Sequence, residues 1–128
     1  MLGENVDEEG PIRSYKDLDV WQLSMQLAKG IYRLSDHFPR KEEFRMTSQL
    51  VRAAISIPAN IAEGNARKSR KDYAHFISIA RGSAAELDRL LLLVKEIGLA
   101  PSDAFTEPAA QVNRVGQMLN VLHRKLSS

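Results

Sequence analysis

The sequence contains no cysteine, which excludes disulfide bonds, a thiolate nucleophile and any zinc site built on cysteine. It also lacks long apolar runs. The longest, residues 90–94, has five residues, whereas a helix needs about 20 apolar residues to span a bilayer. The first ten residues are acidic and have no hydrophobic core, so they do not form a secretory signal. We therefore expect no membrane contact and a cytoplasmic location.

Aromatic residues are scarce as well, at 6% of the chain, while alanine and leucine are plentiful, which favours helix over sheet. The glycines are scattered, so no glycine-rich loop is available to hold a nucleotide phosphate. The histidines, His37, His75 and His123, lie in different segments, and no serine stands in a recognisable nucleophile motif. We therefore expect no enzymatic activity and no cofactor.

Basic and acidic residues are unevenly distributed along the chain. Four acids and no base fall within the first ten residues, and we predict that residues 1–13 form a disordered acidic tail. The rest of the chain carries all 18 basic residues but only 12 of the 16 acidic residues, and this positive excess indicates anionic partners. Residues 14–128 are long enough to bury a core and are predicted to form one domain.

Apolar residues recur at steps of three and four in four segments, which is the period of an amphipathic helix. The segments cover residues 17–36, 42–63, 70–97 and the region after Ser102. Phe44 and Thr47 are expected to continue the apolar side of the second segment. The third and fourth segments each have one main seam, formed by Tyr73, Ile77, Ala80, Ala84, Leu87, Leu91 and Val94, and by Val112, Val115, Leu119, Leu122 and Leu126. Pro39 follows the first segment, and Gly64 and Gly98 are predicted to stop the second and third. The connections are short, so consecutive helices should be antiparallel. The sequence therefore predicts an all-α, up-down-up-down four-helix bundle.

Capping residues mark the expected helix starts. Two pairs, Ser14 with Asp17 and Ser69 with Asp72, have the spacing of a capping box. In a capping box the side chain of each residue accepts a hydrogen bond from the backbone N–H of the other residue. Ser102 is the expected cap of the fourth helix.

Residues 49–64 form the segment around which the bundle is expected to be organised. Its apolar residues make two adjacent seams, Leu50, Ala54, Ile57 and Ile61, and Val51, Ile55, Pro58 and Ala62. Pro58 has no N–H and its ring crowds the preceding turn, so it either kinks the helix or divides it into two short helices. Since the seams stay in phase across the proline, we predict one kinked helix.

The remaining stripe of this segment is polar and consists of Arg52, Ser56, Asn60 and Glu63. It has three interpretations. The stripe faces solvent, or Ser56 and Asn60, which bracket the proline, satisfy backbone groups that the kink disturbs. In the third, the stripe is a subunit interface in which Arg52 and Glu63 find partners.

Each predicted helix has a wider apolar face than a simple bundle core requires. In the first helix, Trp21, Met25 and Tyr32 flank the seam that contains Leu27 and Ile31. A single chain would leave part of this surface in water, which favours self-association. The alternative is a thick core that buries all of it.

One metal-like spacing occurs in the third segment, where Asp72 and His75 share one helix face. Di-iron bundles use such a carboxylate–histidine pair twice, together with two further inward carboxylates. Here the pair occurs once, and the other helices supply no inward carboxylates. We therefore expect no metal site.

The basic residues are most concentrated in the second connection, where Arg67, Lys68, Arg70 and Lys71 supply four charges within five positions. Such a patch beside a helix N-terminus can hold phosphate. The alternative is a solvated loop, which is the common fate of short charge runs. No aromatic residue is interleaved, so we expect contacts with the backbone of a nucleic acid and no reading of its bases.

Much of this pattern resembles a known family, the four-helix bundle proteins encoded in intervening sequences of bacterial 23S rRNA genes. The resemblance covers residues 15–126 and is strongest in QLVRAA at residues 49–54 and SIPANIAEG at residues 56–64. The signature residues in the second stretch are Ser56, Pro58, Asn60, Glu63 and Gly64. YKDL and VWQ near the start, and FP followed by EF at residues 38–44, are also similar. Arg45 and Met46 depart from the pattern, which has a small residue and leucine there.

The resemblance implies a homo-oligomer, a ring of five bundles, without enzymatic activity. The family is similar to accessory proteins of diversity-generating retroelements, which form basic barrels and work with a reverse transcriptase and nucleic acid. By this analogy the chain is expected to bind RNA or DNA and to have a reverse transcriptase as a further partner. The phosphate contacts would come from Arg67, Lys68, Arg70 and Lys71, with Arg52 as an additional candidate. The alternative is a structural or protein-interaction module that does not bind nucleic acid directly.

Overall fold

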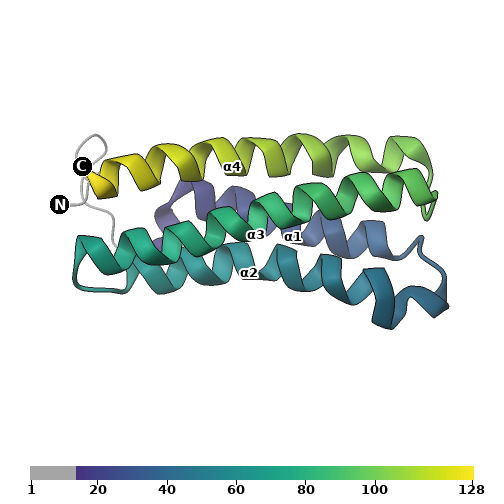
Figure 1. Cartoon of the computed structure of the whole chain (residues 1–128), viewed down its shortest axis with the longest axis horizontal. Helices are drawn as coiled ribbons and strands as arrows, with labels where there is room; N and C mark the ends of the chain where they lie inside the picture. The colour runs from purple at the N-terminus through teal and green to yellow at the C-terminus, as the bar shows by residue number, and fades with distance from the viewer. Residues whose placement is uncertain (1–13) are drawn as a thin grey trace.

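The computed structural model describes residues 14–128, in which four α-helices are joined by short connections (Figure 1). The helices are α1 (Asp19–Ser35), α2 (Ser48–Asn65), α3 (Arg70–Ile97) and α4 (Thr106–Ser127). Each packs on its two neighbours, so that α1 contacts α2 and α4, and α3 contacts α2 and α4. The predicted up-down-up-down four-helix bundle is confirmed. No helix within residues 14–128 has both the length and the apolar character needed to cross a membrane. The predicted acidic tail of residues 1–13 lies outside the described residues.

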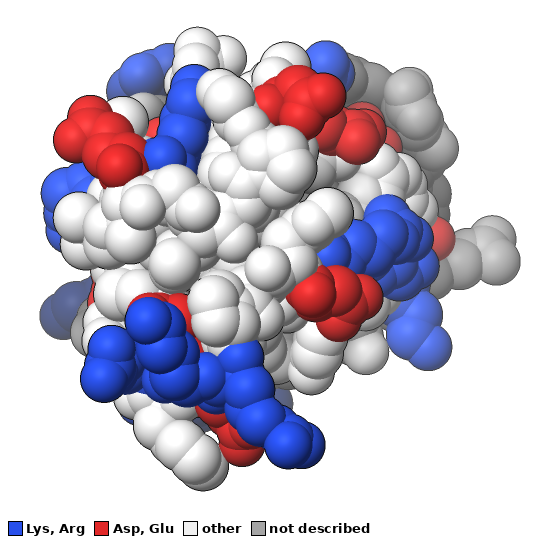
Figure 2. All heavy atoms as spheres, turned by 90° about the vertical axis from the view of Figure 1, so that its right-hand side faces the viewer, with Lys and Arg blue, Asp and Glu red and all other residues white. Residues whose placement is uncertain are grey.

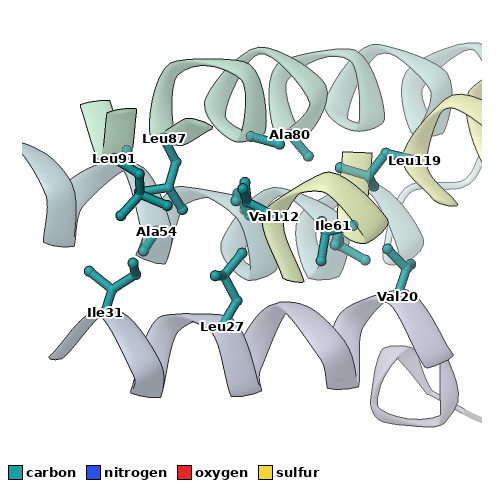
Figure 3. Packing of buried hydrophobic residues seen from close by; sticks show 14 of the residues in the cluster. Val20, Leu27, Ile31, Ala54, Ile61, Ala80, Leu87, Leu91, Val112 and Leu119 are labelled. Carbon is teal, nitrogen blue, oxygen red and sulfur yellow. The ribbon is translucent and has the colours of Figure 1, made fainter. Parts of the chain in front are cut away.

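The buried core is built from the seams that the sequence predicted for three of the helices. All seven seam residues of α3 are buried, as are the first seam of α2 and the seam of α4. Figure 3 shows side chains of all four helices directed into this shared interior, among them Leu27, Ile31, Ala54, Ile61, Leu87, Leu91, Val112 and Leu119. Burying one large aliphatic side chain stabilises a fold by about 1.5–3 kcal/mol, so these seams are the main source of the bundle's stability.

The flanking apolar residues remain partly in water. Tyr32 of α1 is 57% exposed and Ile55 of α2 is 45% exposed. On α3, Leu93 and Ile97 are also exposed. The thick core that would bury the whole apolar width is therefore not formed within one chain.

The first described residues show the predicted capping box at Ser14. The Ser14 N–H donates to the Asp17 carboxylate at 3.3 Å, and the Ser14 hydroxyl accepts the Lys16 N–H at 3.1 Å. This box caps a short 3-10 turn, Tyr15–Asp17, and α1 begins two residues beyond it. Trp21 of α1 packs against Tyr15 in an edge-to-face contact with ring centroids 5.1 Å apart.

The connection between α1 and α2 differs from the prediction. In place of an α-helix from residue 42, a 3-10 turn, Arg40–Glu42, is followed by a π-helical turn, Glu43–Thr47. A π turn holds more residues than an α turn, so it rotates its side chains away from the apolar stripe that an α-helix would continue. Phe44, which was expected to extend that stripe, is 87% exposed.

α2 continues through Pro58 as one helix, in agreement with the prediction of a single element. Pro58 is buried among the core-facing residues of α2. The prediction that Gly64 stops the helix is wrong, because α2 includes Gly64 and ends at Asn65. A Cβ atom at Gly64 would lie 2.9 Å from the Phe76 Cβ and 3.2 Å from the Tyr73 carbonyl oxygen. This glycine is therefore needed for the close approach of α2 and α3 and not for a helix end.

The ends of α3 and the start of α4 test the other predicted signals. Gly98 adopts a left-handed conformation with φ of 85° and ends α3, as expected. Ser102 does not cap α4: it opens a 3-10 turn, Ser102–Phe105, and α4 starts after it without a side-chain cap. Pro108 is tolerated because it lies in the first turn of α4, where backbone N–H groups have no partner within the helix.

Candidate nucleic-acid interface

The four cations of the second connection lie at one end of the bundle. We call Arg67, Lys68, Arg70 and Lys71 the basic loop; all four are exposed. Figure 1 shows that the α2–α3 connection and the C-terminal end of α4 are at the same end of the molecule, opposite the other two connections. The loop is therefore presented at the tip of the bundle, next to the last turn of α4.

Arg67 is held by two contacts within the chain. Its guanidinium lies 2.9 Å from the Glu63 carboxylate, one turn earlier in α2. It also lies over the ring of Phe76, 4.7 Å from the centroid, in a cation–π arrangement. Both partners fix the direction of the Arg67 side chain, and Glu63 offsets part of its charge.

Arg70 links the basic loop to α4. Its guanidinium donates a hydrogen bond to the carbonyl oxygen of Lys125, 55 positions later in the sequence. The last carbonyl groups of a helix have no partner within the helix and carry partial negative charge, so an arginine is favourable there. The contact brings Arg124 and Lys125, both exposed, beside the basic loop. Sequence reasoning missed these two cations.

We call the basic loop together with Arg124 and Lys125 the basic end. Ser69 begins α3, and its hydroxyl accepts the Asp72 N–H at 3.0 Å. The predicted reciprocal capping box is only half formed here, because Ser69 caps the helix and no return bond from the Asp72 side chain is present. Asp72 places a negative charge in the first turn of α3, where a phosphate would otherwise be favoured. The cationic side chains, and not the helix N-terminus, therefore form the anion-attracting surface.

The opposite end of the bundle has a different charge pattern. Figure 2 views this end and shows basic side chains gathered at the lower left and at the right, with acidic groups beside them and an uncharged centre. One close pair at this end is Arg45 and Glu42, whose charged atoms are 3.8 Å apart. Such mixed charge attracts a polyanion less than the basic end does.

Arg52 is separated from the basic end. It precedes Arg67 by 15 residues, which corresponds to roughly 22 Å along a helix. Arg52 lies on the rim of a hollow of about 510 Å³ between α2 and α3, and Glu86 of α3 lines the same hollow. The structure therefore does not bring this predicted phosphate ligand together with the other four.

The rest of the polar stripe joins α2 to α3. The hydroxyls of Ser56 and Ser83 are 2.7 Å apart in a hydrogen bond. The Asn60 side-chain amide donates to the Ser56 carbonyl at 2.8 Å and to the Ser56 hydroxyl at 3.1 Å. Ser56 and Asn60 are thus partly buried and hydrogen-bonded, and do not simply face solvent. The carbonyl that loses its donor at Pro58 belongs to Ala54, and these bonds go elsewhere, so they do not test the second interpretation. Glu63 finds its partner, Arg67, within the same chain.

The metal-like pair of α3 is incomplete. Asp72 and His75 are both exposed. The His75 ring packs edge-to-face on Phe76, with centroids 5.5 Å apart. Among residues 14–128, no group of three or more histidine, aspartate or glutamate side chains is placed to hold a metal ion.

Comparisons with known proteins place this bundle in a family. It is similar to a crystal structure of a protein of unknown function from the S23 ribosomal protein family of Bacteroides thetaiotaomicron, with a TM-score of 0.72 and 26% sequence identity. The match covers 78% of this chain and 94% of that one. No curated protein matches the sequence. The model of the family described as 23S rRNA-intervening sequence protein matches residues 16–121. The chain therefore belongs to the 23S rRNA-intervening sequence protein family.

Proposed function

We propose that this protein is a non-enzymatic homo-oligomer, a ring of five bundles, that binds RNA or DNA through backbone phosphates at the basic end. The observation that carries the proposal is the convergence of six cations, from the α2–α3 connection and the end of α4, on one tip of the bundle. The ring and its number of subunits rest on the family resemblance.

The cations of the basic end divide into two groups. Arg67 and Arg70 make contacts within the chain that hold the loop and α4 in place. Lys68 and Lys71 form no salt bridge among the residues that the structure describes. Lysine is a compact charge on a flexible stem, which suits contact with phosphates whose spacing varies. The two lysines are therefore the main phosphate ligands of the loop.

The surroundings of the loop favour binding without sequence preference. Sequence is read by contacts with base edges, and single strands are often also held by stacking of bases on exposed aromatic rings. Beside the loop, Tyr73 is buried, and Phe76 is partly buried with Arg67 over one face of its ring. These two rings offer little surface on which a base could stack, so binding would depend mainly on charge. In a closed ring of identical bundles the basic ends would all lie on one rim and bind one strand together.

The test is a binding titration of labelled single-stranded RNA and duplex DNA at a series of salt concentrations. The variant carries Lys68→Ala, Lys71→Ala, Arg124→Ala and Lys125→Ala, which spare the two arginines with contacts inside the chain. A matched control removes four exposed cations toward the opposite end, with Arg33→Ala, Arg40→Ala, Lys41→Ala and Lys95→Ala. Affinity should fall steeply with salt, with a slope of about 0.7 to 0.9 per phosphate neutralised. The variant of the basic end should lose both affinity and slope, while the control keeps them. Equal binding by all three proteins would contradict the proposal.

A second candidate function is a protein-interaction module without direct nucleic acid binding. The observation that favours it is Phe44, an aromatic side chain that is 87% exposed. Exposed aromatic residues are common anchors of protein interfaces. A stoichiometric partner protein, such as a reverse transcriptase, that co-purifies after nuclease treatment while the purified protein fails to bind nucleic acid would favour this second function.

A further inference from the structure

An exposed apolar patch lies at one end of the α2/α3 face. It consists of Phe44, Leu93 and Ile97, which are 87%, 48% and 54% exposed. Ser56 of α2 contacts Ser83 of α3, and the two helices are antiparallel. Twelve residues before Ser56 lies Phe44, on the π-helical turn, and twelve residues after Ser83 lies the last part of α3, so these two segments are opposite each other. Leu93 and Ile97 follow Glu86 along the same edge of α3, and Glu86 and Phe44 line one hollow. The three side chains therefore belong to one surface.

This apolar patch is flanked by opposite charges. Glu43 and Arg45 precede and follow Phe44 on the π-helical turn, and both are exposed. The side chain of Arg45 is 67% exposed and lies 3.8 Å from Glu42, a separation that leaves it available to a second acidic group. A partner for the patch would need an apolar or small-residue hollow with one acid and one base beside it.

Such a hollow exists on the neighbouring α3/α4 face. It has a volume of about 550 Å³. Gly82 and Ala85 of α3 and Gly116 of α4 line it. Arg81 and Asp88 also line it, seven positions apart on α3, or roughly 10 Å along the helix. We call it the α3/α4 hollow.

The two glycines of the hollow are not required by the packing of a single chain. A Cβ atom added at Gly82 or at Gly116 would meet no atom within 4 Å. Glycine inside a helix is destabilising relative to alanine, because the unfolded backbone has more freedom to lose. Gly64, by contrast, is in close contact with α3. Close approach of a group from outside the chain would account for Gly82 and Gly116.

We infer that the apolar patch of one copy docks in the α3/α4 hollow of the next copy, with Phe44 against Gly82 and Gly116. This inference rests on the proposed homo-oligomer and names the surfaces that form it. Arg45 then faces Asp88 of the next copy, and Glu43 faces Arg81. The α2/α3 and α3/α4 faces share one helix and are roughly perpendicular. A head-to-tail contact between two faces at an angle can close into a small ring. Phe44 lies level with the last turns of α3 and Gly82 lies roughly 20 Å away along the bundle, so the bundles of a closed ring must be tilted against the ring axis.

The experiment uses two variants of the full chain, measured by light scattering with helicity checked by circular dichroism. Phe44→Glu removes the docking side chain, and Gly82→Leu fills the hollow without meeting a neighbour in the same chain. Each variant alone should have the mass of one chain, 14.3 kDa. Mixed together, they should form dimers and nothing larger, because one intact patch and one intact hollow remain between them.

A control and a rescue separate docking from general loss of apolar surface. Tyr32→Glu changes an exposed aromatic residue on α1 and should leave the oligomer unchanged. Arg45→Glu should weaken assembly, and adding Asp88→Arg to the same chain should restore it. If wild type is an oligomer and both Phe44→Glu and Gly82→Leu keep its mass, these surfaces are the wrong ones while the homo-oligomer stands. Failure of two monomeric variants to dimerise on mixing would also overturn the pairing. A wild-type monomer would overturn the oligomer itself, and the salt titration of the basic end would be unaffected.

Discussion

Gly64→Ala should destabilise the bundle, although alanine favours a helix. The new Cβ would lie 2.9 Å from the Phe76 Cβ, 3.0 Å from the Tyr73 ring and 3.2 Å from the Tyr73 carbonyl oxygen. Two of these three atoms are fixed to the backbone of α3, so a side-chain rotation cannot relieve the contact. Extra atoms in a well-packed site cost about 1–3 kcal/mol. Replacing glycine by alanine inside a helix returns about 1 kcal/mol.

Gly30→Ala is the matched control for this substitution. Gly30 lies inside α1, and a Cβ there would meet only the end of the Gln111 side chain, at an ordinary 3.6 Å. Gly30→Ala should therefore be stabilised by the higher helix propensity of alanine, without the steric cost expected at Gly64. The difference in free energy of unfolding between the two variants therefore isolates the packing term, which we expect to be about 1–3 kcal/mol.

The assay is urea unfolding followed by circular dichroism, at one fixed protein concentration because assembly contributes to apparent stability. Gly64→Ala should unfold at lower urea than Gly30→Ala. If both variants are stabilised equally, then α2 and α3 do not approach closely at Gly64, and its place in the family signature must have another cause.

Three further predictions concern single contacts. Ser56→Ala and Ser83→Ala should show a coupling of about 0.5–1.5 kcal/mol in a double-mutant cycle of unfolding, and strict additivity would mean that the two hydroxyls do not bond. Gly98→Ala should cost about 1–2 kcal/mol because alanine is strained at φ of 85°, and unchanged urea unfolding would count against that conformation. Burial, and to a lesser degree Arg81, lowers the pKa of His123 below its ordinary value of 6.5. As the pH falls, His123 takes up a proton more readily in the unfolded chain than in the folded one, so the free energy of unfolding should fall below pH 6.5. His123→Gln should remove that pH dependence, and an NMR titration that gives a raised pKa for His123 would refute the prediction.

The helices were predictable because burial in this bundle follows the helical period closely. In α3, the residues that recur at steps of three and four from Tyr73 to Val94 are all buried. The same period cannot distinguish a core position from a flanking one, since Ile55 and Leu93 carry the same apolar side chains as the core. The neighbours of each helix decide which seam is covered.

The errors occurred where the backbone leaves the α-helical period or where one helix touches another. The π-helical turn before α2 has no composition of its own, so Phe44 was placed with the core when it lies in solvent. Gly64 has the sequence context of a helix stop, being followed by a polar connection. Its actual role depends on Phe76 and Tyr73, which reach it only after α2 and α3 have packed.

The basic end could have been predicted more fully than it was. In an up-down-up-down bundle, the connection between the second and third helices and the end of the fourth helix must lie at the same tip. Arg124 and Lys125 therefore had to lie near the basic loop. What the topology could not give is the contact of Arg70 with the Lys125 carbonyl, which depends on the distance between two helix ends. That contact makes the cations of α4 part of one surface with the loop, because it holds the end of α4 against the start of α3. In the salt titration, Arg70→Ala should therefore weaken nucleic acid binding by more than Lys71→Ala does, and equal losses would contradict this role of Arg70.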